Sequence, residues 1–274
     1  MKYQRSEKEY SPSIFEKIFF LAEIFFAKFL YDKKTYILIL ISLVPLLTLG
    51  YYDISNISES TFVSLVSSGD DTSSVLSFII LPLICLILGI SAIAEEKENK
   101  TISQLLARPV KREEIVLTKW ITIMVIGITI VCIDALIIYL GICIHIQDFS
   151  ILLEHLDVLI GAWLYLGLWV AVYCTIFLFL GIILDKNPLG WGLVVAYFEA
   201  FFGQFIFGLA AGGGGSAFSI SNHINHVAAE YFLSDYLTFS ITDMDPLQSL
   251  FICFGIIVGF LALSMFSMNR KDFP

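Results

Sequence analysis

The sequence predicts an all-α integral membrane protein with six transmembrane helices. The chain has 274 residues, of which 58 % are hydrophobic and only 15 % are charged, and its mean hydropathy is +0.85. The apolar residues gather in six long runs that carry almost no charge, and the basic residues lie between alternate runs. A soluble core could not bury so much apolar surface, whereas a bilayer can.

Each apolar run is long enough to cross the hydrocarbon core of a bilayer, which takes about 20 helical residues. The predicted spans lie near 35–52, 75–94, 121–143, 158–184, 188–210 and 246–269. Together they form one six-helix transmembrane domain, 35–274, after a cytoplasmic or interfacial segment, 1–34. The first run is not expected to be a signal peptide, because no small-residue cleavage site follows it.

The basic residues predict the orientation of these spans. All sixteen fall in 1–34, in 95–120, at Lys186, or at Arg270 and Lys271, whereas the segments 53–74, 144–157 and 211–245 carry only acidic charge. Lysine and arginine near helix ends mark the cytoplasmic side. The pattern therefore predicts a multi-pass protein of the cell membrane with both termini in the cytoplasm.

Residues 14–31 predict an amphipathic helix ahead of the first span. Glu16, Lys17, Glu23 and Lys28 cluster on one side at 100° per residue, and Phe, Ile and Leu fill the rest. Such a pattern favours a helix lying in the membrane interface. The alternative is a cytosolic helix that packs on a partner.

No cofactor or metal site is expected. The five cysteines lie inside apolar runs, where they are expected to be small buried hydrophobes: Cys85, Cys132, Cys143, Cys174 and Cys253. In the outer segment 211–245, a helix is expected over 223–238. His223, His226 and Glu230 would share one of its faces, but a metal centre needs more ligands than these three, so surface polar residues are expected.

The cytoplasmic loop between the second and third spans has its own pattern. Ile102, Leu105 and Leu106 fall on one helical face, Thr101 can cap that helix and Pro109 ends it. Glu113 and Glu114 follow at the start of the third span, where acidic residues suit a helix N-terminus. The sequence thus predicts a short amphipathic helix on the inner face, and charges such as Lys97 are expected to be solvated.

This loop resembles the signature of type-two ABC transporter permeases, a family that includes the nitrous-oxide-reductase maturation permease. The residues that carry the resemblance are Glu95, Glu96, Thr101, Leu105, Leu106, Pro109, Arg112, Glu113 and Lys119, while Lys100 replaces the usual glycine. The resemblance implies a dimeric membrane unit, formed with a second copy or a paralogue. It also implies a separate ATP-binding chain that contacts Glu95, Glu96, Thr101, Ile102, Leu105, Leu106, Pro109 and Arg112.

Two acidic residues, Asp134 and Glu199, fall near the middle of predicted spans. A carboxylate at mid-bilayer costs about 3 kcal/mol on insertion scales, so such residues often line a transport pathway. The alternative is a protonated, hydrogen-bonded packing role. In the sixth span, Gly255 and Gly259 form a GxxxG pattern that can permit close helix packing.

The sequence as a whole predicts the permease subunit of an ABC transporter, most simply an exporter, with lipid but no nucleic acid among its partners. It has no Walker-type sequence and is therefore not expected to hydrolyse ATP. As a permease it is expected to provide the translocation path and not to be an enzyme. One alternative is an ATP-independent carrier using Asp134 and Glu199. A weaker one is an intramembrane protease using Glu95, Glu96 and the two histidines, which the charge map places on opposite membrane faces.

Overall fold

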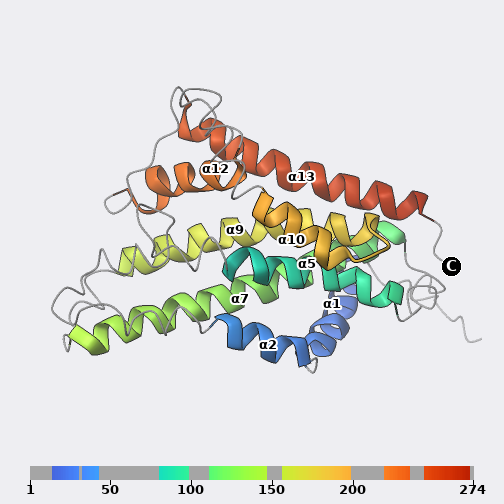
Figure 1. Ribbon diagram of the computed structural model, residues 1–274, viewed down its shortest axis with the longest axis horizontal. Helices are drawn as coiled ribbons and strands as arrows, with labels where there is room; N and C mark the ends of the chain where they lie inside the picture. Colours follow the sequence, from blue (N-terminus) through green and yellow to red (C-terminus); the bar gives the residue numbers. More distant parts are fainter. Residues whose placement is uncertain are drawn as a thin grey trace, which may run out of the picture.

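The protein is described by a computed structural model that covers residues 14–30, 33–42, 80–98, 111–146, 156–198, 219–234 and 244–271. Every regular element in these ranges is a helix, which confirms the predicted all-α class. Three long helices pack side by side along the long axis of the molecule (Figure 1): α7 (Arg112–Ile146), α9 (Leu156–Ile183) and α13 (Pro246–Arg270). Among the described helices, these three are long and apolar enough to cross a membrane.

The other three predicted spans coincide with shorter helices. α2 (Lys33–Ser42) falls in the first span, α5 (Leu81–Glu98) in the second and α10 (Pro188–Phe198) in the fifth. The remaining parts of those spans lie outside the described residues. α7 begins at Arg112 rather than near 121, since its charged first turns find partners within the protein, as shown below.

The core is centred on α9, which packs against α5, α7 and α13. Four aromatic side chains, Tyr165, Trp169, Tyr173 and Phe177, follow one another along it at helical spacing, and the Trp169 and Tyr173 rings stack at 4.8 Å. Gly89 of α5 sits against this row: a Cβ at that position would lie 2.6 Å from the Phe177 Cβ. The absence of a side chain at Gly89 therefore sets how closely α5 approaches α9.

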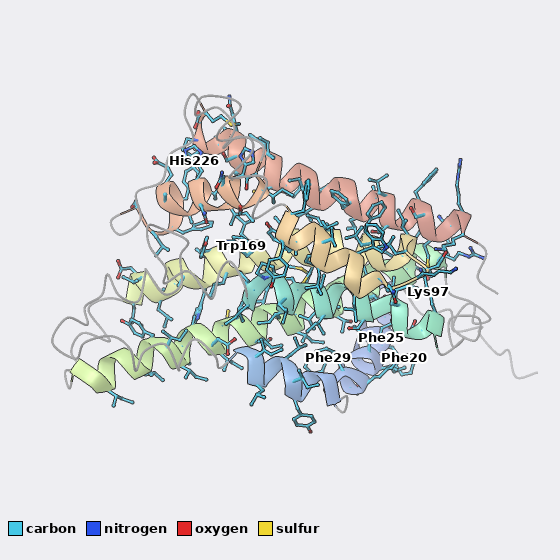
Figure 2. The ribbon with its side chains drawn as sticks, viewed as in Figure 1. Phe20, Phe25, Phe29, Lys97, Trp169 and His226 are labelled. Carbon is cyan, nitrogen blue, oxygen red and sulfur yellow. The ribbon has the colours of Figure 1, made fainter. Side chains whose placement is uncertain are left out.

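Two peripheral helices complete the fold. α1 (Ile14–Leu30) confirms the helix predicted over 14–31; it packs on α7 through Phe25 and Phe29, while Phe20 and Ile24 remain exposed (Figure 2). α12 (Ile220–Val227), extended by a π-helical turn over Ala228–Phe232, packs between α9 and α13. A helix was expected over 223–238, and the observed one begins slightly earlier.

Candidate functional site at the ends of the α5–α7 loop

The predicted loop contact lies mostly outside the described residues, because Thr101, Ile102, Leu105, Leu106 and Pro109 all fall within 99–110. Glu95 belongs to α5, but its side chain is also outside the description. The structure does describe Glu96, at the end of α5, and Arg112, at the start of α7. These helix ends flank the loop and show what the loop is attached to.

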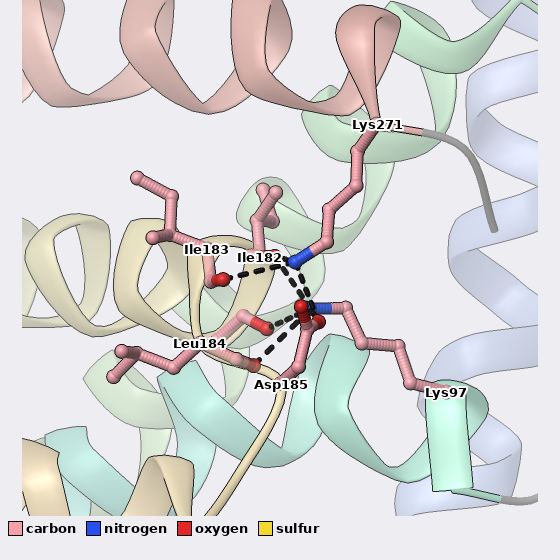
Figure 3. A network of polar contacts seen from close by, with 7 residues as sticks. Lys97, Ile182, Ile183, Leu184, Asp185 and Lys271 are labelled. Carbon is pink, nitrogen blue, oxygen red and sulfur yellow. Dashed lines mark hydrogen bonds and ion pairs between the residues drawn. The ribbon is translucent and has the colours of Figure 1, made fainter.

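On the α5 side, Lys97 binds the C-terminal end of α9. Its Nζ donates to the carbonyl oxygens of Gly181 at 2.8 Å, Ile182 and Leu184, and it lies 3.4 Å from Asp185 Oδ1 (Figure 3). The last carbonyls of a helix have no intrahelical partner and carry its negative dipole end, so an ammonium is stabilised there. The expectation of a solvated Lys97 is therefore wrong: its side chain is only 14 % exposed.

Lys271, just after α13, approaches the same helix end from the other side. Its Nζ donates to the carbonyls of Ile182 and Ile183 at 3.0 and 2.9 Å and pairs with Asp185 Oδ1 at 2.5 Å (Figure 3). Two lysines, one from α5 and one just after α13, thus meet at the carboxylate of Asp185. The hydrogen bond from Lys271 lowers the pKa of Asp185. For Lys97, burial outweighs the attraction to Asp185 and lowers the pKa to about 8, and the charge of Lys271 adds to this effect.

On the α7 side, Arg112 binds the C-terminal end of α13. Its guanidinium donates to the carbonyls of Met268 at 3.0 Å, Asn269 at 3.4 Å and Lys271 at 2.8 Å. Asn269 in turn donates to Glu113 Oε1 at 2.8 Å. Both ends of the loop are therefore fixed to the C-terminal end of another helix, α9 through Lys97 and α13 through Arg112.

Glu96 points into the protein and forms an ion pair with Lys119 of α7. Lys119 Nζ lies 2.7 Å from Glu96 Oε1, and both side chains are 6 % exposed. The same ammonium donates to the Ala92 carbonyl and lies 4.1 Å from the centre of the Phe25 ring of α1. Lys28 of α1 lies 3.9 Å from Glu96 Oε1. Together these contacts join α1, α5 and α7. They give the charged second turn of α7 a partner inside the protein, which explains how α7 can begin so early.

Of the two predicted intramembrane acids, Asp134 is buried within α7, with 6 % of its surface exposed, and Glu199 lies outside the described residues. A role for either in a pathway stays a prediction. Nearby, the indole N–H of Trp163 donates to the Cys132 carbonyl at 3.1 Å, which ties α9 to the same stretch of α7.

The two histidines of α12 are not surface residues as expected. His223 and His226 are both buried, and the Nδ1 atoms of both rings lie within hydrogen-bond distance of Ser249 Oγ, at 3.1 and 3.0 Å. Burial lowers the pKa of His226. Glu230 is exposed, and the described residues contain no cluster of three metal-ligating groups. Figure 2 shows His226 and Lys97 at opposite ends of the molecule.

The residues that hold the loop were largely missed by sequence reasoning. Lys271 follows the last turn of a predicted span, a place where a cation suits a helix C-terminus, but nothing in the sequence shows that it would bind a different helix. Lys97 lies in a charged run that is equally typical of a solvated loop, and Lys119 follows four uncharged residues that give no sign of its partner. Their partners, the carbonyls of α9 and the Glu96 carboxylate, are close only in the folded chain.

No curated protein matches the chain. A family model described as ABC-2 family transporter protein matches residues 19–273, which include most of α1 and all the other described helices. The chain therefore belongs to the ABC-2 family of transporter proteins, whose members are membrane components of ABC transporters.

Proposed function

We propose that this chain is the permease subunit of an ABC exporter and that a separate ATP-binding protein drives it through the inner loop between α5 and α7. Family membership supports the permease role. The observation that supports the coupling route is the attachment of both loop ends to other helices, Lys97 to α9 and Arg112 to α13. A displacement of the loop would then move four helix ends together.

The apolar trio Ile102, Leu105 and Leu106 is proposed as the docking contact. Glu96 is occupied by its buried pair with Lys119, so its contribution is to hold α5 on α7 beneath the loop. Protein interfaces draw most of their stability from a few buried apolar anchors, often about 2 kcal/mol or more each. A charge placed among them would be buried without a partner.

The test is Leu105→Asp, compared with Lys186→Asp, which places the same residue at an exposed position outside the loop. At matched membrane levels, Leu105→Asp is expected to lose co-purification of the ATP-binding protein and its transport-coupled ATP hydrolysis. Lys186→Asp is expected to keep both. Wild-type docking and coupling in Leu105→Asp would remove this loop from the mechanism.

We further propose six spans with both termini in the cytoplasm. The side chains of Lys97, Arg112 and Lys271 gather at one end of the bundle, as the positive-inside rule requires of a cytoplasmic face. In a variant without native cysteines, single cysteines at positions 67 and 216 should react with an impermeant reagent in intact cells. A cysteine at position 103 should not react, and its labelling would contradict this topology.

The functional unit is proposed to be a homodimer or heterodimer of permeases. Gly255 and Gly259 of α13 support this, since a Cβ at either position would meet no atom within 4 Å in the described part of the chain. The close approach that GxxxG allows is thus not used by the described helices. For Asp134 and Glu199, two roles are proposed as alternatives: contact with the transport pathway, or protonated and hydrogen-bonded packing between the spans.

A further inference from the structure

A pocket of about 60 Å³ opens between α1, α5 and α7, next to the Glu96–Lys119 pair. One part of its lining is charged or polar and includes Lys28, Glu96, Lys119 and Thr122. The rest is apolar, and its largest members are Phe25, Phe29, Leu88, Ile123 and Ile126. The pocket thus has the two-part character of an amphiphile, with a charged end and an apolar wall.

The charges of the pocket favour an anion. Two ammonium groups, Lys28 and Lys119, face one carboxylate, Glu96, so one positive charge remains in excess. Lys119 is held at the bottom by Glu96, by the Ala92 carbonyl and by the Phe25 ring. Lys28 is 55 % exposed and stands at 3.9 Å from Glu96, so its ammonium can turn toward a ligand. A single phosphodiester charge would balance the site.

The surroundings favour a lipid over a soluble ion. Phe20, Ile24 and Phe26 of α1 are exposed beside the pocket-lining residues of that helix, as is expected of a helix in contact with a bilayer. The pocket has room for only a few water molecules, so it holds only one end of an amphiphile. The rest of the bound lipid would lie along the exposed apolar side of α1.

We propose that this pocket binds one membrane phospholipid with an anionic headgroup. The phosphate lies near Lys28, and the first part of an acyl chain lies against Phe29 and Ile126. This inference rests on the interfacial position proposed for α1. It does not depend on the ATP-binding partner, because binding is measured on the purified chain alone.

The test is native mass spectrometry of the full-length chain, titrated with phosphatidylglycerol or with phosphatidylcholine of the same acyl chains. The wild-type protein is expected to retain one phosphatidylglycerol at a lipid concentration at which it retains no phosphatidylcholine. Lys28→Glu should weaken this binding by about tenfold or more, the size of one charge-assisted hydrogen bond. Lys186→Glu, a charge reversal at an exposed inner lysine outside the pocket, should leave binding unchanged.

A second pair of variants tests the apolar wall. Ile126→Trp fills the pocket and should also abolish retention, whereas Ile133→Trp, on the same helix at a position that is 50 % exposed, should not. Equal retention of the two lipids, or wild-type binding by Lys28→Glu, would overturn the proposal. Displacement of the lipid by millimolar inorganic phosphate would assign the site to a free anion and overturn the lipid assignment as well.

Discussion

The buried ion pair between Glu96 and Lys119 gives the sharpest test of how the helix ends beside the α5–α7 loop are held together. Glu96→Ala removes the carboxylate 2.7 Å from an ammonium that is 6 % exposed. Breaking a buried pair on one side typically costs about 3–5 kcal/mol, because the remaining charge has lost its partner. The Ala92 carbonyl and the Phe25 ring still face Lys119, so the lower half of that range is expected.

The measurement is the midpoint of thermal unfolding in mild detergent. At roughly 2–4 °C per kcal/mol for a chain of this size, a loss of about 3–4 kcal/mol in Glu96→Ala should lower the midpoint by about 6–16 °C. The double variant Glu96→Leu with Lys119→Met replaces both charges by apolar groups of similar volume, and such replacements are often neutral or stabilising. Its midpoint should therefore return to near the wild-type value.

Comparing the single and the double variant also separates the two roles considered for Glu96. If Glu96 acts only by holding α5 on α7, the double variant should recover docking of the ATP-binding protein together with stability. If its carboxylate contacts the partner directly, stability should return while docking remains lost. A single variant Glu96→Ala that unfolds at the wild-type temperature would refute the reasoning from burial.

Two further predictions concern packing and pH. Gly89→Ala should lower the unfolding midpoint, because its methyl group would lie 2.6 Å from the Phe177 Cβ and 3.0 Å from the Cys174 carbonyl oxygen. Overpacking of this kind costs about 1–3 kcal/mol of stability. Gly167→Ala, with open space around it, should be tolerated in the same assay. The pKa of Lys97 is lowered to about 8 in the folded protein from its ordinary value of 10.5. Between these two pH values the unfolded chain binds more protons than the folded one, so the free energy of unfolding should rise as pH rises through this window. The midpoint should thus increase between pH 7.5 and 9.5, and the increase should be smaller in Lys97→Met; an equal increase in both proteins would count against the assignment.

The three long apolar helices were predictable because hydropathy and charge are properties of each residue that add along a segment. Thirteen isoleucine, leucine and valine residues outweigh Asp134 in the third predicted span, and α7 indeed runs through it without a break. The acidic pair Glu113 and Glu114 marked a helix start, and it lies in the first turn of α7, where Glu114 accepts from the Lys111 N–H. The family signature was likewise local, since it occupies one loop.

The partners of the charged residues were decided by the tertiary structure alone. Lys97 and the two histidines of α12 were expected on solvated surfaces, and Glu96 at the contact with the ATP-binding chain, because the sequence shows the cost of burying a polar group but not the partner that offsets it. In the fold, Lys119 lies on the next helix, the α9 carbonyls come from a span far along the chain, and Ser249 comes from α13. Transfer energy is a sum over residues, whereas an ion pair or a capped helix end needs two segments in one place, and only packing brings them together.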